Sequence, residues 1–455
     1  MKVSRRRTPD VNLNLNVRGL SPSPTLAVNE RCQELLAQGR QVFKLGLGQS
    51  PFPVPEVVVE ALRQNAHQKD YLPVKGLPAL KEAVAEYHRR KQGIPRTADD
   101  VLIGPGSKEL MFLVQLVYYG DLVIPTPSWV SYAPQAQIIG HLVRWLPTRS
   151  EHNWLLQPEE LEALCATDPD RPRLLILNYP NNPTGHTYNV EELKELARIA
   201  RLYRVLLLSD EIYGEIHHKG QHRSIAEFYP EGTIISSGLS KWCGAGGWRL
   251  GTFTFPKSLH WLLDAMAAVA SETYTSTSAP IQYAAVRAFQ GGPEIEHYLA
   301  QCRRILRALG KHCTEQLKEA GVKVFRPKGA FYLFPSFSPL KKMLEARGIN
   351  SNRELCERLL EETGVATLPG VSFGRPDYKM ALRLAYVDFD GKAALEAAER
   401  IPLERPLDER FLRTYCANVT TAIDRICEWA TSGLNGRRLV TTPAHEDAVA
   451  KPAHS

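Results

Sequence analysis

One lysine, Lys241, lies among small residues in the run SGLSKWCGAGGWRLG at residues 237–251, eight positions before Arg249. A lysine amine can form a Schiff base with an aldehyde cofactor when the backbone approaches closely and a fixed cation neutralises the cofactor's phosphate. Glycines permit that approach, and the arginine supplies the cation. The spacing indicates a lysine that holds pyridoxal phosphate, although a lone lysine in a Gly/Ser loop is more often a solvated charge.

Two segments upstream have the residue types that would bind the rest of such a cofactor. The run GPGSKE at residues 104–109 follows an apolar stretch and precedes a helical period, which predicts a strand, a tight turn and a helix start. Such a turn presents backbone N–H groups and a hydroxyl, here at Ser107 and Lys108, to a phosphate. Trp129 follows the strand-like residues 121–125, where a loop leaves the sheet, and could stack on a pyridine ring.

Two further apolar strands end in polar groups. Asn182 lies in the turn-rich run LNYPNNPTG at residues 177–185, which makes it a fixed amide donor, and Asp210 ends a strand with Tyr213 three residues later. A carboxylate against a pyridine nitrogen keeps it protonated and makes the ring an electron sink, while Asn182 and Tyr213 would hold the ring's oxyanion. The alternatives are a helix cap for Asp210 and a rim aromatic for Tyr213; the order of all five segments disfavours both.

These residues resemble the class I and II aminotransferases, which are pyridoxal phosphate enzymes of fold type I, over about residues 20–430. The resemblance is sharpest around Lys241 and in NPTG at residues 182–185. It implies that Lys241 forms the Schiff base and shuttles protons, that Asp210 partners the ring nitrogen, and that Trp129 stacks on the ring.

The same resemblance assigns the phosphate contacts to Ser107, the Lys108 backbone and Arg249, joined by Tyr71 in the run DYLP at residues 70–73. In this family the residue at the position of Tyr71 commonly reaches across a dimer interface. The resemblance therefore implies a homodimer.

Two positions bear on the substrate. Arg383 stands alone in the apolar run MALRLAY at residues 380–386. Its bidentate fork suits the α-carboxylate of an amino acid, the role that the resemblance assigns to it, and a structural ion pair is the alternative. Gly48, in LGLGQSP at residues 45–51, resembles the family's N-terminal loop over the same carboxylate, whereas Gly46 is interpreted as serving only the turn.

Two departures from the family pattern limit the assignment. Many relatives carry a serine three residues before the lysine, where this chain has Gly238, so the phosphate contact of Ser237 or Ser240 stays open. The segment at residues 273–280 offers hydroxyls where the most familiar dicarboxylate enzymes use an arginine of the neighbouring subunit. A distal carboxylate is therefore not predicted from that segment, but another arginine or lysine could bind one, and aspartate stays open as a substrate.

The pattern of elements predicts an α/β fold. Strand-like runs alternate with helical periods such as residues 190–203; these runs are 101–103, 121–124, 174–178, 204–209, 233–237 and 251–255. A mostly parallel central sheet in a large domain follows, with a smaller α+β domain after about residue 310. The predicted organisation is a flexible N-terminal arm (1–19), an N-terminal segment joining the small domain (20–65), a large cofactor-binding domain (66–310), a small C-terminal domain (311–434) and a disordered tail (435–455). Apolar spacing over residues 411–429 predicts one last helix.

Composition narrows the class of protein. The 455 residues are 44% hydrophobic, which is enough for a substantial core, and no apolar run is long enough to span a membrane. The net charge is +7, and the first eighteen residues hold five basic residues and one acidic residue, so the rest is near neutral. We interpret the N-terminal end as an arm that binds no nucleic acid and contains no secretory signal. Its proline and asparagines would interrupt an amphipathic helix, which disfavours a mitochondrial presequence.

Cysteine and histidine usage predicts neither disulfides nor a metal. The eight cysteines show no Cys-x-x-Cys pair, which suits reduced thiols in a cytoplasmic protein. Cys243, two residues after Lys241, is interpreted as packing filler, with a redox role as the alternative. His217, His218 and His222 flank a Lys-Gly turn, and we interpret them as a solvated hairpin with no metal site.

We therefore expect a pyridoxal phosphate-dependent aminotransferase that moves an amino group between an L-amino acid and a 2-oxo acid by a ping-pong Schiff-base mechanism. A lyase, decarboxylase or oxidase acting on an amino acid is the alternative, because the same scaffold supports these reactions. A regulator that senses a ligand with such a domain is disfavoured, since the few residues before the first motif cannot form a DNA-binding domain.

Overall fold

The computed structural model describes residues 12–432, and a seven-stranded sheet forms the centre of the larger domain. In sheet order its strands are β2 (Val101–Gly104), β8 (Gly251–Thr254), β7 (Thr233–Gly238), β6 (Leu206–Asp210), β5 (Arg173–Asn178), β3 (Asp121–Thr126) and β4 (Val143–Pro147). The strands run parallel except β8, which is antiparallel to both of its neighbours. The predicted fold class, α/β with a mostly parallel central sheet, is confirmed.

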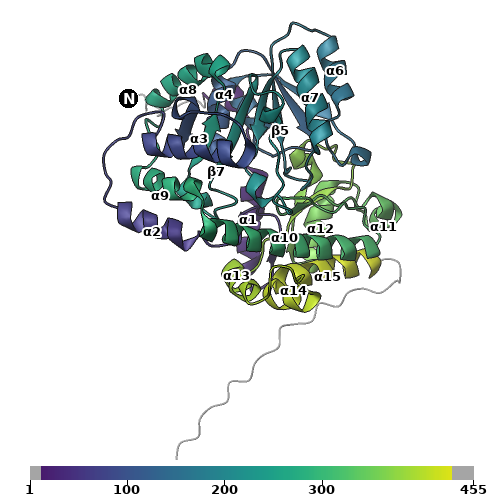
Figure 1. The fold of residues 1–455 in the computed structure, drawn as a ribbon. Helices are drawn as coiled ribbons and strands as arrows, with labels where there is room; N and C mark the ends of the chain where they lie inside the picture. Colours follow the sequence, from purple (N-terminus) through teal and green to yellow (C-terminus); the bar gives the residue numbers. More distant parts are fainter. Residues whose placement is uncertain (1–11, 433–455) are drawn as a thin grey trace, which may run out of the picture.

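Helices cover both faces of this sheet (Figure 1). One face carries α4 (Ser107–Val117), α5 (Tyr132–Ile139) and α8 (His260–Glu272), and the other carries α3 (Pro78–Gln92), α6 (Pro158–Ala166) and α7 (Val190–Leu202), with α2 (Glu56–Asn65) and α9 (Ala279–Gln290) packed beside α3. Alternate residues of β5 serve the two faces: Ile176 packs with α4 and α5, whereas Leu175 packs with α6 and α7. Burial on both faces explains why β5, with the sequence RLLILN, is a nearly continuous apolar run.

The smaller domain surrounds the long helix α10 (Pro293–Glu319), which passes without a break through the predicted boundary at residue 310. Its three-stranded antiparallel sheet has the order β11 (Leu368–Pro369), β12 (Leu382–Ala385) and β9 (Tyr332–Leu333). The helices are α11 (Lys341–Ala346), α12 (Asn352–Thr363), α13 (Gly391–Glu399), α14 (Glu409–Tyr415) and α15 (Ala417–Ser432). In Figure 1 the last three lie below α10, and the large sheet lies above it.

The N-terminal segment joins the small domain through backbone pairing. After α1 (Pro24–Ala37), the short strand β1 (Phe43–Lys44) pairs in parallel with β10 (Val365–Ala366). A 3-10 turn at Leu15–Val17 contacts α5 instead. The predicted tail and residues 1–11 of the predicted arm lie outside the described residues.

The prediction of one last helix is wrong, because two helices, α14 and α15, occupy that stretch. Cys416, between them, has φ −121° and ψ 33°, outside the helical region. Both helices contact α10, and Phe411 on α14 and Ile426 on α15 are buried. The apolar spacing therefore continues across a break that it does not reveal.

The interpretation of residues 217–222 as a solvated hairpin is also wrong. His217 and His218 are buried, and His218 Nε2 donates to the carbonyl oxygen of Ala330 at 3.0 Å. His222 Nε2 lies 2.7 Å from a carboxylate oxygen of Glu211. The turn packs against the loop before β9, which is over a hundred residues away in the sequence. The polar residues of the turn itself therefore do not indicate that it is buried. Within residues 12–432, no group of three or more His, Cys, Asp or Glu could hold a metal ion.

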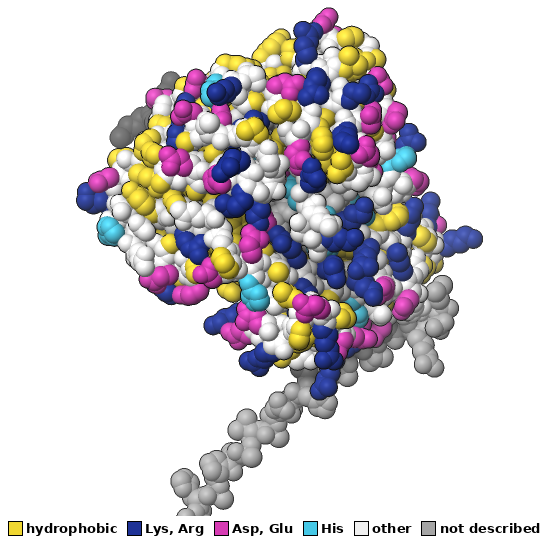
Figure 2. Space-filling view, viewed as in Figure 1, with side chains coloured by type: hydrophobic (Ala, Val, Ile, Leu, Met, Phe, Trp, Pro, Cys, Tyr) yellow, Lys and Arg dark blue, Asp and Glu magenta, His cyan; other side chains and the backbone are white. Residues whose placement is uncertain are grey.

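Lys and Arg side chains gather over α10 in the face viewed in Figure 2. Two arginines of α10 are bound within the protein: Arg303 donates to Glu215, and Arg304 donates to the carbonyl oxygens of Ile401 and Pro402. These two side chains therefore connect α10 to other segments of the protein. No helix of the described part of the chain is long and apolar enough to cross a membrane.

Candidate active site

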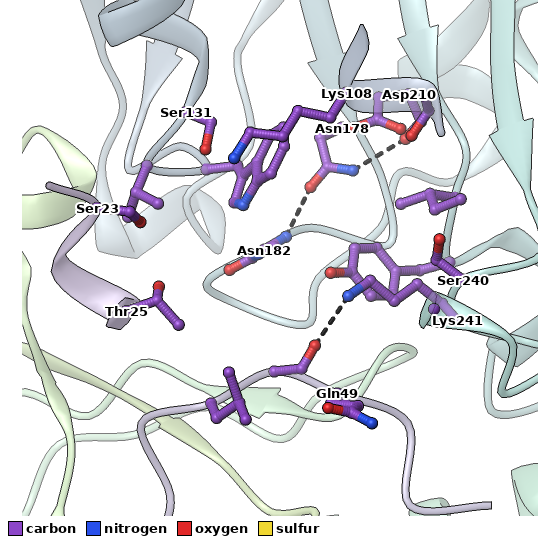
Figure 3. A pocket seen from close by; sticks show the side chains of 18 of the residues that line it. Ser23, Thr25, Gln49, Lys108, Ser131, Asn178, Asn182, Asp210, Ser240 and Lys241 are labelled. Atoms are coloured by element: carbon purple, nitrogen blue, oxygen red, sulfur yellow. Dashed lines mark hydrogen bonds between the residues drawn. The ribbon is translucent and has the colours of Figure 1, made fainter. Parts of the chain in front are cut away.

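One cavity of about 540 Å³ collects the predicted site residues (Figure 3). Those that line it are Gly48, Ser107, Lys108, Trp129, Asn182, Asp210, Tyr213, Lys241, Arg249 and Arg383. Tyr71 is the exception: it is 88% exposed and is absent from the lining within the protomer. Residues that are more than 300 positions apart in the sequence thus meet in one place.

The strand ends explain this meeting. Asp210 ends β6, Asn178 ends β5, and Lys241 follows the end of β7, so the three approach the cavity from the carboxyl edge of the parallel strands. Asn178 connects the end of β6 to the loop that follows β5. Its Nδ2 donates to the Asp210 backbone oxygen at 2.9 Å, and its Oδ1 accepts from the Asn182 N–H at 2.7 Å. Both hydrogen bonds are drawn in Figure 3. Asn178 was not among the predicted residues.

Lys241 is held as a partly buried amine. Its Nζ donates to the Gly48 carbonyl oxygen at 2.8 Å. Burial lowers the pKa of Lys241 to about 8, and the positive charges of Arg383 and Arg249 add to this, while Asp210 opposes it. The amine therefore loses its proton more readily than an ordinary lysine, as a nucleophile or general base at neutral pH must.

Asp210 is a buried carboxylate with a short hydrogen bond. The hydroxyl of Tyr132, at the start of α5, donates to Asp210 Oδ2 at 2.5 Å, and Ser236 Oγ lies 3.4 Å from Oδ1. Burial raises the pKa of Asp210 to about 6, and the Tyr132 hydrogen bond opposes the rise. Such a carboxylate, in the lining of the cavity, suits a partner for a protonated ring nitrogen. Tyr132 was not predicted, because a tyrosine on an apolar helix face is usually a core residue.

The turn before α4 is built for close approach. A Cβ at Gly106 would overlap the Arg249 guanidinium, and a Cβ at Gly251 would overlap the backbone nitrogen of Ser107. Gly106 also has φ +96°, a conformation that favours glycine. The first N–H groups of α4 and the Arg249 side chain therefore share one corner of the cavity, where an anion would be bound.

The two serines near the lysine differ in position. Ser240 lines the cavity, whereas Ser237 is buried within β7 and is not in the lining. Cys243 is buried too, and burial raises the pKa of its thiol to about 12. A thiol that resists ionisation is a poor redox group, which agrees with its interpretation as packing filler.

Arg383 also lines the cavity and is 2% exposed. Its Nη1 donates to Asn182 Oδ1 at 3.0 Å and its Nη2 donates to the Gly46 carbonyl oxygen at 2.6 Å. The rings of Tyr332 and Phe373 lie 4.8 and 5.0 Å from the guanidinium carbon. No carboxylate of the described residues pairs with it, and its Nε is buried without a hydrogen-bond partner there. The alternative of a structural ion pair does not apply, and Gly46 does more than serve a turn.

Lys108 extends into the same cavity. Its Nζ lies 5.5 Å from the centre of the Trp129 ring, and burial followed by the charge of Arg249 lowers its pKa. Figure 3 shows Lys108 across the cavity from Ser23 and Thr25, which lie just before and within α1. Sequence reasoning used only the backbone of Lys108 and missed both hydroxyl residues, which lie over 80 positions away in a different element.

The charges of the lining show what the cavity fits. Among the described residues it holds four cationic side chains, Lys108, Lys241, Arg249 and Arg383, and one carboxylate, Asp210. Such an excess of positive charge needs anions. Pyridoxal phosphate together with an amino acid would bring a phosphate to the corner near Arg249 and a carboxylate to Arg383, with the amine of Lys241 between them.

Comparisons with known proteins agree with this geometry. The sequence profile of "Aminotransferase class I and II" matches residues 40–401. The aspartate aminotransferase of Geobacillus stearothermophilus is 35% identical over 86% of this chain and 98% of its own length. The asparagine–oxo-acid transaminase of Streptococcus mutans is 31% identical over the same shares. The solved structure of Thermus thermophilus aspartate aminotransferase with maleate covers 92% of this chain and 99% of its own, at 31% identity and a TM-score of 0.78.

Proposed function

Because this chain belongs to the class I and II aminotransferase family, we propose that it takes the amino group from a dicarboxylic amino acid of the aspartate type and passes it to a 2-oxo acid. The chain is a pyridoxal phosphate-dependent aminotransferase; the proposal concerns its substrate and the roles of its residues.

Lys108 is the observation that carries the substrate proposal. Its amine lies in the cavity beside Trp129 and has no acidic partner among residues 12–432. Arg383, at another part of the lining, suits the α-carboxylate that every amino acid carries. A second cation would pair with a second carboxylate, and the hydroxyls of Ser23 and Thr25 would add hydrogen bonds. The names of the relatives point the same way, since several are aspartate aminotransferases and one solved structure holds maleate, a dicarboxylate.

Pyridoxal phosphate, when bound, supplies an electron sink for the negative charge that develops at the substrate's α-carbon. Lys241 would take the proton from that carbon, since its lowered pKa makes the neutral amine available. Asp210 would hold a proton on the ring nitrogen, with Tyr132 orienting its carboxylate. Arg383 would fix the α-carboxylate, and Asn182 and Tyr213 would donate to the ring oxygen. The amide oxygen of Asn182 is occupied by Arg383, which leaves its nitrogen as the donor.

The phosphate contacts follow the corner of the cavity near α4. Ser107, the Lys108 backbone N–H, Ser240 and Arg249 would hold the phosphate, and the position of Ser240 in the lining favours it over the buried Ser237. Trp129 would stack on the ring, and Gly48 would cover the substrate carboxylate.

We also propose a homodimer in the cytoplasm. Tyr71 is exposed and outside the cavity of its own protomer, which supports a phosphate contact made by Tyr71 of the partner subunit. The eight cysteines are unpaired, as in a reducing compartment. Light scattering would measure the mass in solution, and a monomer with full cofactor affinity would contradict the dimer.

The substrate proposal is tested by Lys108→Met. We expect kcat/KM for aspartate to fall about 10- to 100-fold, the effect of losing one hydrogen bond to a charged group, while kcat/KM for alanine changes less than about twofold. The release of the matching 2-oxo acid is the measurement. Lys318→Met, which changes an exposed lysine on α10, is the control for loss of one amine. Equal losses with both donors would contradict a role in binding the distal carboxylate, and so would no loss with either.

A further inference from the structure

Tyr332, on β9 of the small domain, touches three parts of the cavity and was not predicted from the sequence. Its hydroxyl oxygen lies 2.9 Å from the hydroxyl oxygen of Tyr213. Its ring centre lies 4.8 Å from the guanidinium carbon of Arg383. A Cβ added at Gly48 would overlap the Tyr332 hydroxyl, so the backbone of that loop packs directly on it. Both tyrosines are buried, which makes their hydrogen bonds costly to lose.

The number of protons decides the direction of the bond between the two hydroxyls. A phenol has one proton to donate. If Tyr213 donates its proton to the ring oxygen of the cofactor, then its own oxygen must accept from Tyr332. Burial raises the pKa of both phenols, so each keeps its proton at neutral pH. The chain of donors then runs from Tyr332 through Tyr213 to the cofactor, and each bond strengthens the next.

Strand pairing also places Tyr332 next to the strand that carries Arg383, the proposed ligand of the substrate carboxylate. Tyr332 on β9 lies opposite Ala385 on β12, the strand that carries Arg383. Tyr213 comes from the loop after β6 in the large domain. The bond between the two hydroxyls is thus a contact between domains, and the side chain that makes it also packs on the guanidinium.

We propose that Tyr332 is a positioning residue: its hydroxyl donates to Tyr213 and so orients and strengthens Tyr213 as the donor to the cofactor's ring oxygen, while its ring holds Arg383 in place for the substrate carboxylate. This inference rests on the placement of Tyr213 in the proposed function. The hydroxyl and the ring of Tyr332 thus have separate roles, which separate substitutions can test.

The hydroxyl is tested by Tyr332→Phe in the protein loaded with pyridoxal phosphate. The measurement is the pH titration of its visible absorption, which reports the pKa of the Lys241 nitrogen bonded to the cofactor. When that nitrogen is deprotonated, it no longer donates to the ring oxygen, which then depends more on Tyr213. Weakening Tyr213 therefore disfavours the deprotonated form and raises this pKa. We expect Tyr213→Phe to raise it and Tyr332→Phe to raise it by roughly 0.3 to 1 unit, the effect of one neutral hydrogen bond.

A double variant tests whether the two hydroxyls act together, and Tyr332→Leu tests the role of the Tyr332 ring. Tyr213→Phe with Tyr332→Phe should titrate like Tyr213→Phe alone, because the two hydroxyls act in series. Tyr332→Phe keeps the ring, so KM for amino acid donors should stay within about twofold, whereas Tyr332→Leu removes the ring and should raise KM about tenfold or more. Tyr386→Phe is the matched control, since it removes a buried phenol hydroxyl of the same domain that lies near the Ala330 carbonyl and outside the lining.

Each outcome has a separate meaning. A shift with Tyr213→Phe but none with Tyr332→Phe would overturn the inference and leave the proposed function intact. Additive shifts in the double variant would also overturn it, because the hydroxyls would then act independently. If Tyr213→Phe itself gave no shift, the placement of Tyr213 would be wrong, and the inference would fall with it. An equal shift with Tyr386→Phe would show a general effect of losing a buried hydroxyl, which contradicts the specific role.

Discussion

Replacing Lys241 by methionine should stabilise the cofactor-free protein, because the fold buries the lysine's amine with only the Gly48 carbonyl as hydrogen-bond acceptor among residues 12–432. The pKa of Lys241 falls from its ordinary 10.5 to about 8. That lowering corresponds to a cost of about 3 kcal/mol for burying the charged amine at neutral pH. Methionine removes this cost and leaves the Gly48 carbonyl without its donor, a loss of about 1 kcal/mol. The expected net gain is roughly 2 kcal/mol in the free energy of unfolding.

The gain should depend on pH in a defined direction. The folded protein releases the Lys241 proton at about pH 8, whereas the unfolded chain keeps it to about pH 10.5. Between these values the unfolded state binds more protons, so the stability of the wild type rises with pH and the advantage of Lys241→Met shrinks. Urea unfolding of both proteins, freed of cofactor, between about pH 7 and pH 10 measures this difference, and other titrations cancel in it. Lys318→Met is again the control for loss of one lysine.

Two results would refute this reasoning. One is a Lys241→Met protein no more stable than the wild type near pH 7. The other is a gain that stays constant up to about pH 10, because it would come from packing alone and not from a buried charge.

Two further predictions concern Arg383 and Tyr132, which both line the cavity. Arg383→Lys should lower kcat/KM for aspartate and alanine alike, by about 10- to 100-fold, because one amine cannot reproduce the two-pronged contact with an α-carboxylate; steady-state kinetics with both donors measures it, and a loss confined to aspartate would contradict the assignment. Tyr132→Phe should destabilise the cofactor-free protein by about 1–3 kcal/mol near pH 8 and by less near pH 5, because the pKa of Asp210 is about 6 and a protonated carboxyl gains less from the hydroxyl. Urea unfolding at the two pH values tests this, and equal losses would be the contrary result.

Sequence patterns and the family resemblance were sufficient to select Lys241, Asp210 and Asn182, which the structure brings to one cavity. Asp210 ends β6, and Asn182 and Lys241 follow β5 and β7; each of these strands has an apolar stretch that is visible in the sequence. The carboxyl ends of parallel strands meet at one edge of a sheet, which explains why these three residues lie in one cavity. The mostly parallel sheet and its helices followed from the same alternation of elements.

Contacts between distant segments needed the tertiary structure. Tyr132 meets Asp210 across 78 positions and Tyr332 meets Tyr213 across 119, and neither tyrosine differs locally from an ordinary core aromatic. The same holds for the histidine turn, whose burial is provided by a distant loop, and for the break at Cys416, which leaves the apolar spacing unchanged. Local patterns record which face of an element is apolar, because that face must leave water. Which partner covers the face, and which hydroxyl reaches which carboxylate, is decided by the packing of sheet, helices and the second domain.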